Sequence, residues 1–474
     1  MNKRIVNRYV AMLMAALFTL ATVFASSTMN VSAATKLRVT SSVKTIAVKS
    51  STTLKANKSV KWSVVKGTKV VKLVNKKSKS VTVKGLKAGT ATVKAKAGKK
   101  YVTTKITVKK NGSVTTGAEI SGTVVAKIDL SKGAYKDGKV TKIWAPIPES
   151  DNYQTISDVK CEAPDAKVAK TTKDSAGNTV YYIEFDESVP AEKRTGEISY
   201  KVTRKEIKST DMVEIGTVNK KEMAKYLGEF ETSGSLTSGV VKGTADKIVK
   251  DAKAKTVLQK ARAIFDWEVQ NLYRRETAVD DLKFSGCGRG EVQMVLETTK
   301  GGKCTDLNST FVALLRSQGI PAREKFGMRI NAGKSGVLKA PEHCRAEFYL
   351  PGTGWVEADP ADTLKALLKD GISFESGKVG REARASEERW NALYAQYWGA
   401  NDNNWVKLAS GRDITLNPKQ EAKCPEGKDW ERCVLNKSGT LNNMGYIYGE
   451  TDGKYMNAYD AAAFGYTYEF VATN

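Results

Sequence analysis

Alternation of apolar and polar positions dominates the chain between residues 36 and 110. Short runs with a period of two, at 80–84, 90–95 and 101–108, are separated by glycine-containing turns. Such a period places successive side chains on opposite faces of a strand, and short strands joined by turns favour a two-sheet sandwich. The pattern therefore predicts a small all-β domain over residues 34–112.

Strands resume after a polar linker at 111–117, with alternating runs at 122–130, 179–185 and 196–203. Acidic residues, which are absent from residues 1–112, appear here for the first time. The change in composition and the continued period of two predict a separate β-sandwich domain over residues 113–210.

Near residue 245 the period becomes helical, with apolar side chains recurring at helical spacing up to Tyr273. A strand framed by Pro341 and Pro351 and a charged helical stretch beyond Asp370 follow. These patterns predict a third domain over residues 211–474, with a core at 250–363 and a C-terminal extension. The predicted fold class is multidomain, with N-terminal all-β sandwiches followed by an α+β domain.

The first residues carry a targeting pattern rather than a folded element. Lys3, Arg4 and Arg8 precede an apolar run at 10–25, and small residues follow at 31–34. This order predicts a secretory signal peptide over residues 1–33. The alternative, an uncleaved anchor, is disfavoured because a spanning helix needs about 20 apolar residues. We therefore expect a secreted or cell-surface protein, wall-associated, without a transmembrane segment in the mature chain.

The net charge of +26 is concentrated at the N-terminal end. Residues 1–112 hold 25 Lys and Arg and no acidic residue, and the remaining 52 basic residues face 51 acidic ones. Lys predominates, and Trp62 and Tyr101 are the only aromatic residues between 35 and 112, which is a poor set for stacking on bases. We expect anionic cell-wall polymers as partners of this segment, or no partner at all, and no nucleic acid.

Six cysteines are scattered along the chain, and one histidine is present. Cys424 and Cys433 bracket a turn-like stretch, which makes them the candidate disulfide; outside the cytosol such bonds persist. The other four cysteines are expected to be unpaired. Without Cys-x-x-Cys spacing and with a single histidine, neither a zinc site nor any other metal or cofactor is expected.

The single histidine, His343, opens an alternating run at 343–350 that reads as a half-buried strand. A turn at 351–354 follows, and a second run returns to Asp359 and stops at Pro360. The two strands bring an imidazole and a carboxylate to one end of a sheet. An aspartate in this position holds the tautomer of the ring and stabilises the imidazolium.

A nucleophile that matches this pair is Cys304. Gly301 and Gly302 lead to it, and the segment 305–319 after it has helical spacing. A cysteine at a helix N-terminus is stabilised as thiolate by the helix dipole and by free N–H groups. The alternative is a buried structural thiol. The combination with the hairpin favours a catalytic triad of Cys304, His343 and Asp359.

Two parts of the chain each resemble a known family. The segment 83–93, with Trp62-Ser63 upstream, resembles bacterial Ig-like domains of the second group, which serve as spacers or adhesive modules. The motif 302–304, the run 315–323 and the hairpin from His343 to Pro360 resemble the transglutaminase-like superfamily over about residues 250–363. This second resemblance implies a papain-like α+β core with Cys304 as nucleophile, His343 as base and acid, and Asp359 as the residue that orients it.

The resemblance implies an enzyme that acts on amide bonds of proteins or peptides through a thioester on Cys304. Hydrolysis, as in a cysteine peptidase or amidase, is the main hypothesis, and protein crosslinking by acyl transfer is one alternative. A non-catalytic surface adhesion protein is the other. Trp267 and Tyr273 are candidate oxyanion donors, although both also fit a core stripe.

Side-chain alternation restricts the register of the hairpin. Asp359 reaches His343 only if Tyr349, and not Leu350, pairs with Trp355, or if a bulge intervenes. Cys344, where the family often has a small or apolar residue, is expected to face away from His343 on the same strand.

Overall fold

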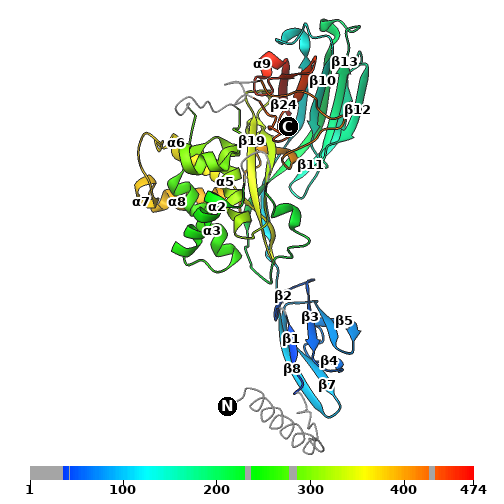
Figure 1. Ribbon diagram of the computed structural model, residues 1–474, viewed down its shortest axis with the longest axis vertical. Coiled ribbons are helices and arrows are strands. Elements are labelled where there is room, and N and C mark those ends of the chain that lie inside the picture. Colours follow the sequence, from blue (N-terminus) through cyan, green and yellow to red (C-terminus); the bar gives the residue numbers. More distant parts are fainter. Residues whose placement is uncertain (1–35, 42, 230–235, 277–285, 426–432, 474) are drawn as a thin grey trace, which may run out of the picture. The chain divides into compact units, whose positions relative to one another are not determined.

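The computed structural model describes residues 36–41, 43–229, 236–276, 286–425 and 433–473 (Figure 1). The segment predicted to be a signal peptide, 1–33, lies outside the described residues. The chain divides into two compact units, one ending at Lys109 and the other beginning at Lys110. No helix in the described part of the chain is both long and apolar enough to cross a membrane.

The first unit is all-β, as the alternation predicts, with two four-stranded sheets around its own core. The first sheet has the order β1 (Val39–Ser41), β3 (Ser51–Ala56), β6 (Ser80–Gly85), β5 (Val71–Lys77). The second has the order β2 (Thr45–Ala47), β8 (Lys100–Lys109), β7 (Gly89–Ala97), β4 (Lys61–Lys66). Leu54, Val83 and Ile106 are fully buried between them, whereas every lysine of this unit is exposed except the half-buried Lys58 and Lys94.

The second unit contains a β-sandwich that the sequence places at 113–210, but the sandwich is not built from that segment alone. One sheet has the order β12 (Val168–Lys173), β13 (Thr179–Phe185), β10 (Thr141–Ile147), β22 (Tyr448–Thr451), β23 (Lys454–Met456). The other has the order β11 (Gln154–Glu162), β14 (Thr195–Thr210), β9 (Val114–Asp129), β24 (Tyr466–Ala472), β18 (Gly336–Leu338).

The C-terminal strands therefore complete both sheets of the sandwich. Phe464, Tyr466 and Phe470 bury their rings in the same core as Val124 and Ile183. The expected boundary at residue 210 thus does not separate two compact units, because β-pairing joins residues more than 300 positions apart.

A third, antiparallel sheet positions the candidate site. It has the order β20 (Gly354–Ala358), β19 (Glu342–Leu350), β17 (Ala322–Arg329), β21 (Trp405–Ser410). Apart from α9 (Ala461–Phe464), the labelled helices of this unit gather beside β19 in Figure 1. They are α2 (Gly239–Asp251), α3 (Val257–Asn271), α5 (Cys304–Ser317), α6 (Pro360–Lys369), α7 (Arg381–Arg384) and α8 (Glu387–Tyr397).

Smaller elements complete this unit: β15 (Tyr273–Arg274), β16 (Gly301–Gly302), α4 (Val292–Met294) and α9 (Ala461–Phe464). The helices and the sheet share one apolar core, in which Phe265 of α3, Phe311 of α5 and Phe348 of β19 are fully buried. Burying an aromatic side chain of this size contributes about 1.5–3 kcal/mol. The residues at 250–363 therefore form an α+β layer, as predicted.

Candidate active site

Helix α5 begins at Cys304, so the thiol lies at the positive end of a buried helix. The two glycines before it are required by close packing rather than by flexibility. Gly301 has φ +157°, and a Cβ on it would lie 2.0 Å from the backbone oxygen of Tyr273. A Cβ on Gly302 would lie 2.5 Å from that of Asp306. Both glycines pair with Tyr273 and Arg274 as the short parallel strand β16, which holds the start of α5 in place.

The hairpin of β19 and β20 has the register that the triad requires. Tyr349 pairs with Trp355, and Ala346 with Ala358, so continuation of the same register would set Asp359 opposite Arg345. This confirms the predicted pairing. The chain leaves the sheet at Asp359 because Pro360 starts helix α6.

Asp359 uses its two carboxylate oxygens for different tasks. Oδ1 accepts a hydrogen bond from the N–H of Asp362 at 3.0 Å and thereby caps helix α6. Oδ2 lies 2.9 Å from Nε2 of His343. The aspartate is fully buried and His343 is 4% exposed. The helix cap therefore fixes the carboxylate that orients the imidazole, which leaves Nδ1 of the ring for another partner.

A second carboxylate also faces the ring. Oδ2 of Asp362 lies 3.3 Å from Nε2 of His343 and is itself held by Arg329 of β17 at 2.6 Å. Burial and the charge of Arg329 both favour the neutral imidazole. The charges of Asp362 and Asp359 and the hydrogen bond that the ring donates to Asp359 outweigh them and raise the pKa of His343 to about 10. At neutral pH the ring is therefore an imidazolium.

The nucleophile shows the opposite shift. Burial alone would raise the pKa of the Cys304 thiol, but hydrogen bonds with Cys287, Cys344 and His343, and the charge on His343, bring it well below its usual value. The two opposite shifts favour a thiolate on Cys304 and an imidazolium on His343, whose ring Asp359 holds at 2.9 Å. The structure thus brings the three predicted triad residues together.

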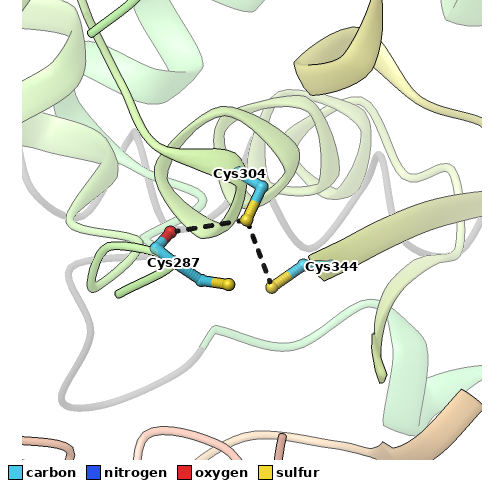
Figure 2. Close-up of side chains that lie close together, drawn as sticks. All are labelled: Cys287, Cys304 and Cys344. Atoms are coloured by element: carbon cyan, nitrogen blue, oxygen red, sulfur yellow. Dashed lines mark hydrogen bonds between the residues drawn. The ribbon is translucent and has the colours of Figure 1, made fainter. Parts of the chain in front are cut away.

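Two further cysteines lie against the nucleophile, as Figure 2 shows. The sulfur of Cys304 is 4.0 Å from that of Cys344 and 3.8 Å from the backbone oxygen of Cys287. Cys344 points toward α5, where its sulfur lies 2.9 Å from Oγ1 of Thr305. The side chain of Cys344 therefore lies on the face of β19 that packs against α5, next to Cys304. The ring of His343, the preceding residue, hydrogen-bonds to Asp359 instead of contacting α5 in this way.

The two oxyanion candidates occupy other positions. The hydroxyl of Tyr273 donates to the backbone oxygen of Lys378 at 2.9 Å, and its ring packs over Arg384. Trp267 lies on α3, half-buried against the apolar core. Among the described residues, no hydrogen bond joins either side chain to Cys304 or His343, and the core interpretation describes both better.

The predicted disulfide partners, Cys424 and Cys433, are bonded in the structure with their Cα atoms 5.7 Å apart. The residues between them that were read as a turn lie partly outside the described residues. Cys161, Cys287, Cys304 and Cys344 are free thiols.

A cavity of about 660 Å³ is lined in part by Cys287, whose backbone oxygen lies 3.8 Å from the sulfur of Cys304. Its lining includes Gly286, Cys287, Glu342, Tyr446, Tyr459 and Tyr466. Burial, with the charge of Cys304 as a smaller cause, raises the pKa of Glu342 to about 7. Four tyrosines in all and two carboxyls, of Glu342 and Asp460, make this a space for a ligand with both apolar and polar groups.

Asp362, Arg329 and Cys287 complete the site, and sequence reasoning did not find them. Asp362 could have been found, because an aspartate three residues after Asp359 is the spacing of a helix cap with an acidic first turn. Arg329 and Cys287 have no such local signal, since each reaches the site only through the fold.

The role of Asp362 gives a testable result. Replacing it with asparagine removes the largest influence that raises the pKa of His343 and leaves the opposing charge of Arg329 in place. We expect the pKa of His343 to fall from about 10, so that the ring loses its proton at lower pH than in the wild type. Because His343 is the only histidine, NMR of the imidazole signals measures this directly.

The matched control for this measurement is Asp370→Asn. Asp370 forms a surface ion pair with Arg389 at 2.8 Å, so it carries the same change of charge away from the ring. The control should titrate like the wild type. If Asp362→Asn also titrates like the wild type, Asp362 does not act on the imidazole.

Comparison with known proteins agrees with this geometry. A family model described as transglutaminase-like superfamily matches residues 242–360. An uncharacterized protein of Haemophilus influenzae is 29% identical over 351 residues, which cover 69% of this chain and 85% of that protein.

Solved structures with similarity to the chain have low identity. A proposed cysteine protease from Cytophaga hutchinsonii is 15% identical, with a TM-score of 0.40, over 76% of this chain and all of that one. The periplasmic domain of TgpA from Pseudomonas aeruginosa is 12% identical, with a TM-score of 0.26, over 55% of this chain and 96% of that one. The family match, which spans the helix that carries Cys304 and the hairpin that carries His343 and Asp359, decides the assignment: residues 242–360 are a transglutaminase-like domain.

Proposed function

We propose that this protein is a secreted or cell-surface cysteine enzyme that hydrolyses amide bonds of proteins or peptides through a thioester on Cys304. The observation that carries the proposal is the pairing of a low-pKa thiol with a histidine whose Nε2 lies 2.9 Å from Asp359. This arrangement supplies a nucleophile, a proton donor and a group that orients the donor.

The first half-reaction forms the thioester. The Cys304 thiolate attacks the carbonyl carbon of the amide, and a C–S bond forms. The N–H of Thr305 is occupied by the backbone oxygen of Cys287 at 2.7 Å, so we assign the N–H of Cys304 to the developing oxyanion. The His343 imidazolium then gives its proton to the leaving nitrogen, and the C–N bond breaks.

The second half-reaction releases the product. His343, now neutral, takes a proton from a water molecule that attacks the thioester carbonyl. The tetrahedral intermediate collapses with loss of the Cys304 thiolate, which leaves a carboxylic acid and restores the ion pair. The raised pKa of His343 favours the protonated form at the start of each cycle.

Product analysis tests the reaction class. The full chain would be incubated with peptides and cell-wall fragments, with and without a fluorescent primary amine, and products identified by mass spectrometry. We expect new carboxylates together with released ammonia or amines, even when the fluorescent amine is present. Incorporation of that amine in place of hydrolysis would identify a crosslinking acyltransferase and overturn the hydrolytic proposal. Absence of any acyl-enzyme on Cys304 would favour an adhesion protein.

The proposed location has two independent supports. The N-terminal segment has the order of charge, apolar run and small residues of a leader. The bond between Cys424 and Cys433 suits an oxidising compartment, since structural disulfides are rare where thiols are kept reduced.

The lysine-rich unit gives a prediction about partners. A fragment of residues 35–112 should bind heparin or anionic wall polymers at low salt, because nearly all its lysines are exposed. The retention should fall steeply with salt, since charges are screened over about 8 Å at physiological ionic strength and about 3 Å at 1 M. Column retention of the fragment, compared with residues 113–474, measures this.

The comparison fragment has nearly balanced charge and should pass unretained. Retention of residues 35–112 that does not change with salt would point to a mechanism other than charge. A complete lack of retention would leave the unit as a spacer.

A further inference from the structure

The cysteines around the nucleophile form a triangle of sulfur atoms. The sulfurs of Cys287, Cys304 and Cys344 all lie within 4.8 Å of one another, and each side chain is at most 4% exposed. They come from three separate places: a loop, the first residue of α5 and the strand β19 (Figure 2). The spacing of these cysteines along the sequence gives no sign of the cluster.

Each corner of the triangle is fixed by contacts independent of the other sulfurs. The N–H of Cys287 donates to the Tyr446 hydroxyl at 2.8 Å, and its backbone oxygen accepts from Thr305. Cys344 is held in the ladder between β19 and β17, opposite Phe326. Cys304 is fixed by the helix that it starts. The three thiols are therefore a preformed set rather than a chance approach of mobile side chains.

The dimensions suit one metal ion. Three sulfurs arranged in a plane around a metal, with bonds of about 2.3 Å as in zinc thiolate sites, lie about 4.0 Å apart. The distance between the sulfurs of Cys304 and Cys344 is 4.0 Å. The possible ligand atoms of His343, Asp359 and Asp362 form a separate group. Among the described residues, the cysteine cluster therefore offers three sulfur ligands and no others.

We propose that Cys287, Cys304 and Cys344 bind one soft, thiophilic cation, Cu⁺, in a three-coordinate thiolate site that occupies the nucleophile. Zinc in structural sites takes four ligands, whereas soft thiolates select Cu⁺. Binding forms three Cu–S bonds and releases the protons of those thiols that are not yet ionised. No redox change takes place, and removal of the ion restores the free thiols.

A positive charge beside the cluster supports an anionic site of this kind. Arg274 ends the short strand β15 and is 8% exposed. Burial opposes its charge, but the nearby Cys304, Glu276 and Cys287 outweigh burial and raise its pKa. The guanidinium is therefore placed to offset the negative charge that Cys304 and Cys287 carry as thiolates once the ion is bound.

The test is anaerobic titration of the full chain with Cu⁺ in competition with a chromophoric Cu⁺ chelator. We expect one Cu⁺ per chain. Cys287→Ser and Cys344→Ser should each weaken binding by at least about 100-fold, since even loss of an outer contact to a metal ligand costs 10–100-fold. Cys161→Ser is the matched control, because Cys161 is a free thiol of strand β11 outside the cluster, and should bind like the wild type.

Copper K-edge X-ray absorption of the loaded wild type gives a second measurement that needs no variant to fold. Three sulfur neighbours at about 2.3 Å are expected. Two sulfur neighbours, equal Cu⁺ affinity of Cys287→Ser and the wild type, or loss of binding in Cys161→Ser would each overturn the proposal.

Discussion

Replacing Cys304 with alanine should lower amide hydrolysis by about 10⁵-fold or more, the scale seen when the nucleophile of a hydrolytic triad is removed. No other described thiol can substitute. Cys304 alone begins helix α5. In the wild type the hydrogen bond with Cys304 and burial raise the pKa of Cys287, and burial is the largest cause that raises the pKa of Cys344. Burial persists in the variant and still favours the protonated form of both thiols. The measurement is kcat/KM on whichever amide substrate the product analysis identifies.

Cys161→Ala is the control for this variant. Its thiol is half-buried on β11, and burial raises its pKa to about 11, so the change should leave activity within a factor of about two. Near-wild-type activity of Cys304→Ala, in a protein with an unchanged circular dichroism spectrum, would remove Cys304 from the mechanism.

Asp359→Asn should lower kcat by about 10³-fold or more while leaving stability nearly unchanged. Asparagine is a good helix cap, so its side-chain oxygen can keep the bond to the N–H of Asp362 that caps α6. Its amino group then faces Nε2 of His343, where a carboxylate oxygen now lies at 2.9 Å. An N–H donor at that position favours the neutral ring with its proton on Nδ1, and leaves Asp362 alone, at 3.3 Å, to stabilise the imidazolium. A comparable change in a serine protease costs about 10⁴-fold.

Two measurements separate this effect from misfolding. The thermal midpoint should stay within a few degrees of the wild type, because the cap is retained, and the single imidazole signal should shift toward its neutral form. Full activity with a neutral ring would show that the imidazolium is not required. Asp370→Asn, at the surface, is again the matched control.

The placement of Cys304, His343 and Asp359 could be predicted because its signals are local. A strand ending at Asp359, a proline start to the next helix and alternation from His343 onward restrict the hairpin register to the one observed. The same applies to Cys304, which two glycines and a helical period place at a helix N-terminus. In each case neighbours within a few residues supply the physical constraint.

The remaining features depend on pairings that no local pattern encodes. Strands β22 and β24 complete the sandwich from the far end of the chain, because a sheet edge accepts any strand of matching alternation. Cys287 reaches Cys304 through a loop whose amides bind the buried carboxylate of Asp306 at Arg289 and Gly290. Trp267 and Tyr273 have a local pattern, but it does not identify an oxyanion donor. An aromatic residue at helical spacing is far more often a core residue than a catalytic one.

The central claim is that Cys304 is a thiolate paired with His343 at neutral pH. The most direct test is the rate of iodoacetamide alkylation of each free cysteine from pH 5.5 to 9, followed by mass spectrometry of the peptides. Exposure alone predicts that Cys161, which is half-buried, reacts faster than Cys304, which is 3% exposed. Ionisation predicts that Cys304 reacts faster. An ordinary thiol with a pKa of about 8.5 loses reactivity tenfold for each pH unit below that value.

Because the pKa of Cys304 lies well below its usual value, its thiolate persists as the pH falls. We predict that Cys304 reacts faster than Cys161, Cys287 and Cys344, at a rate that changes little between pH 8 and pH 6.5. His343→Ala should slow it and restore the ordinary dependence on pH. Uniform rates for all four thiols, or a tenfold loss per pH unit at Cys304 in the wild type, would contradict the account.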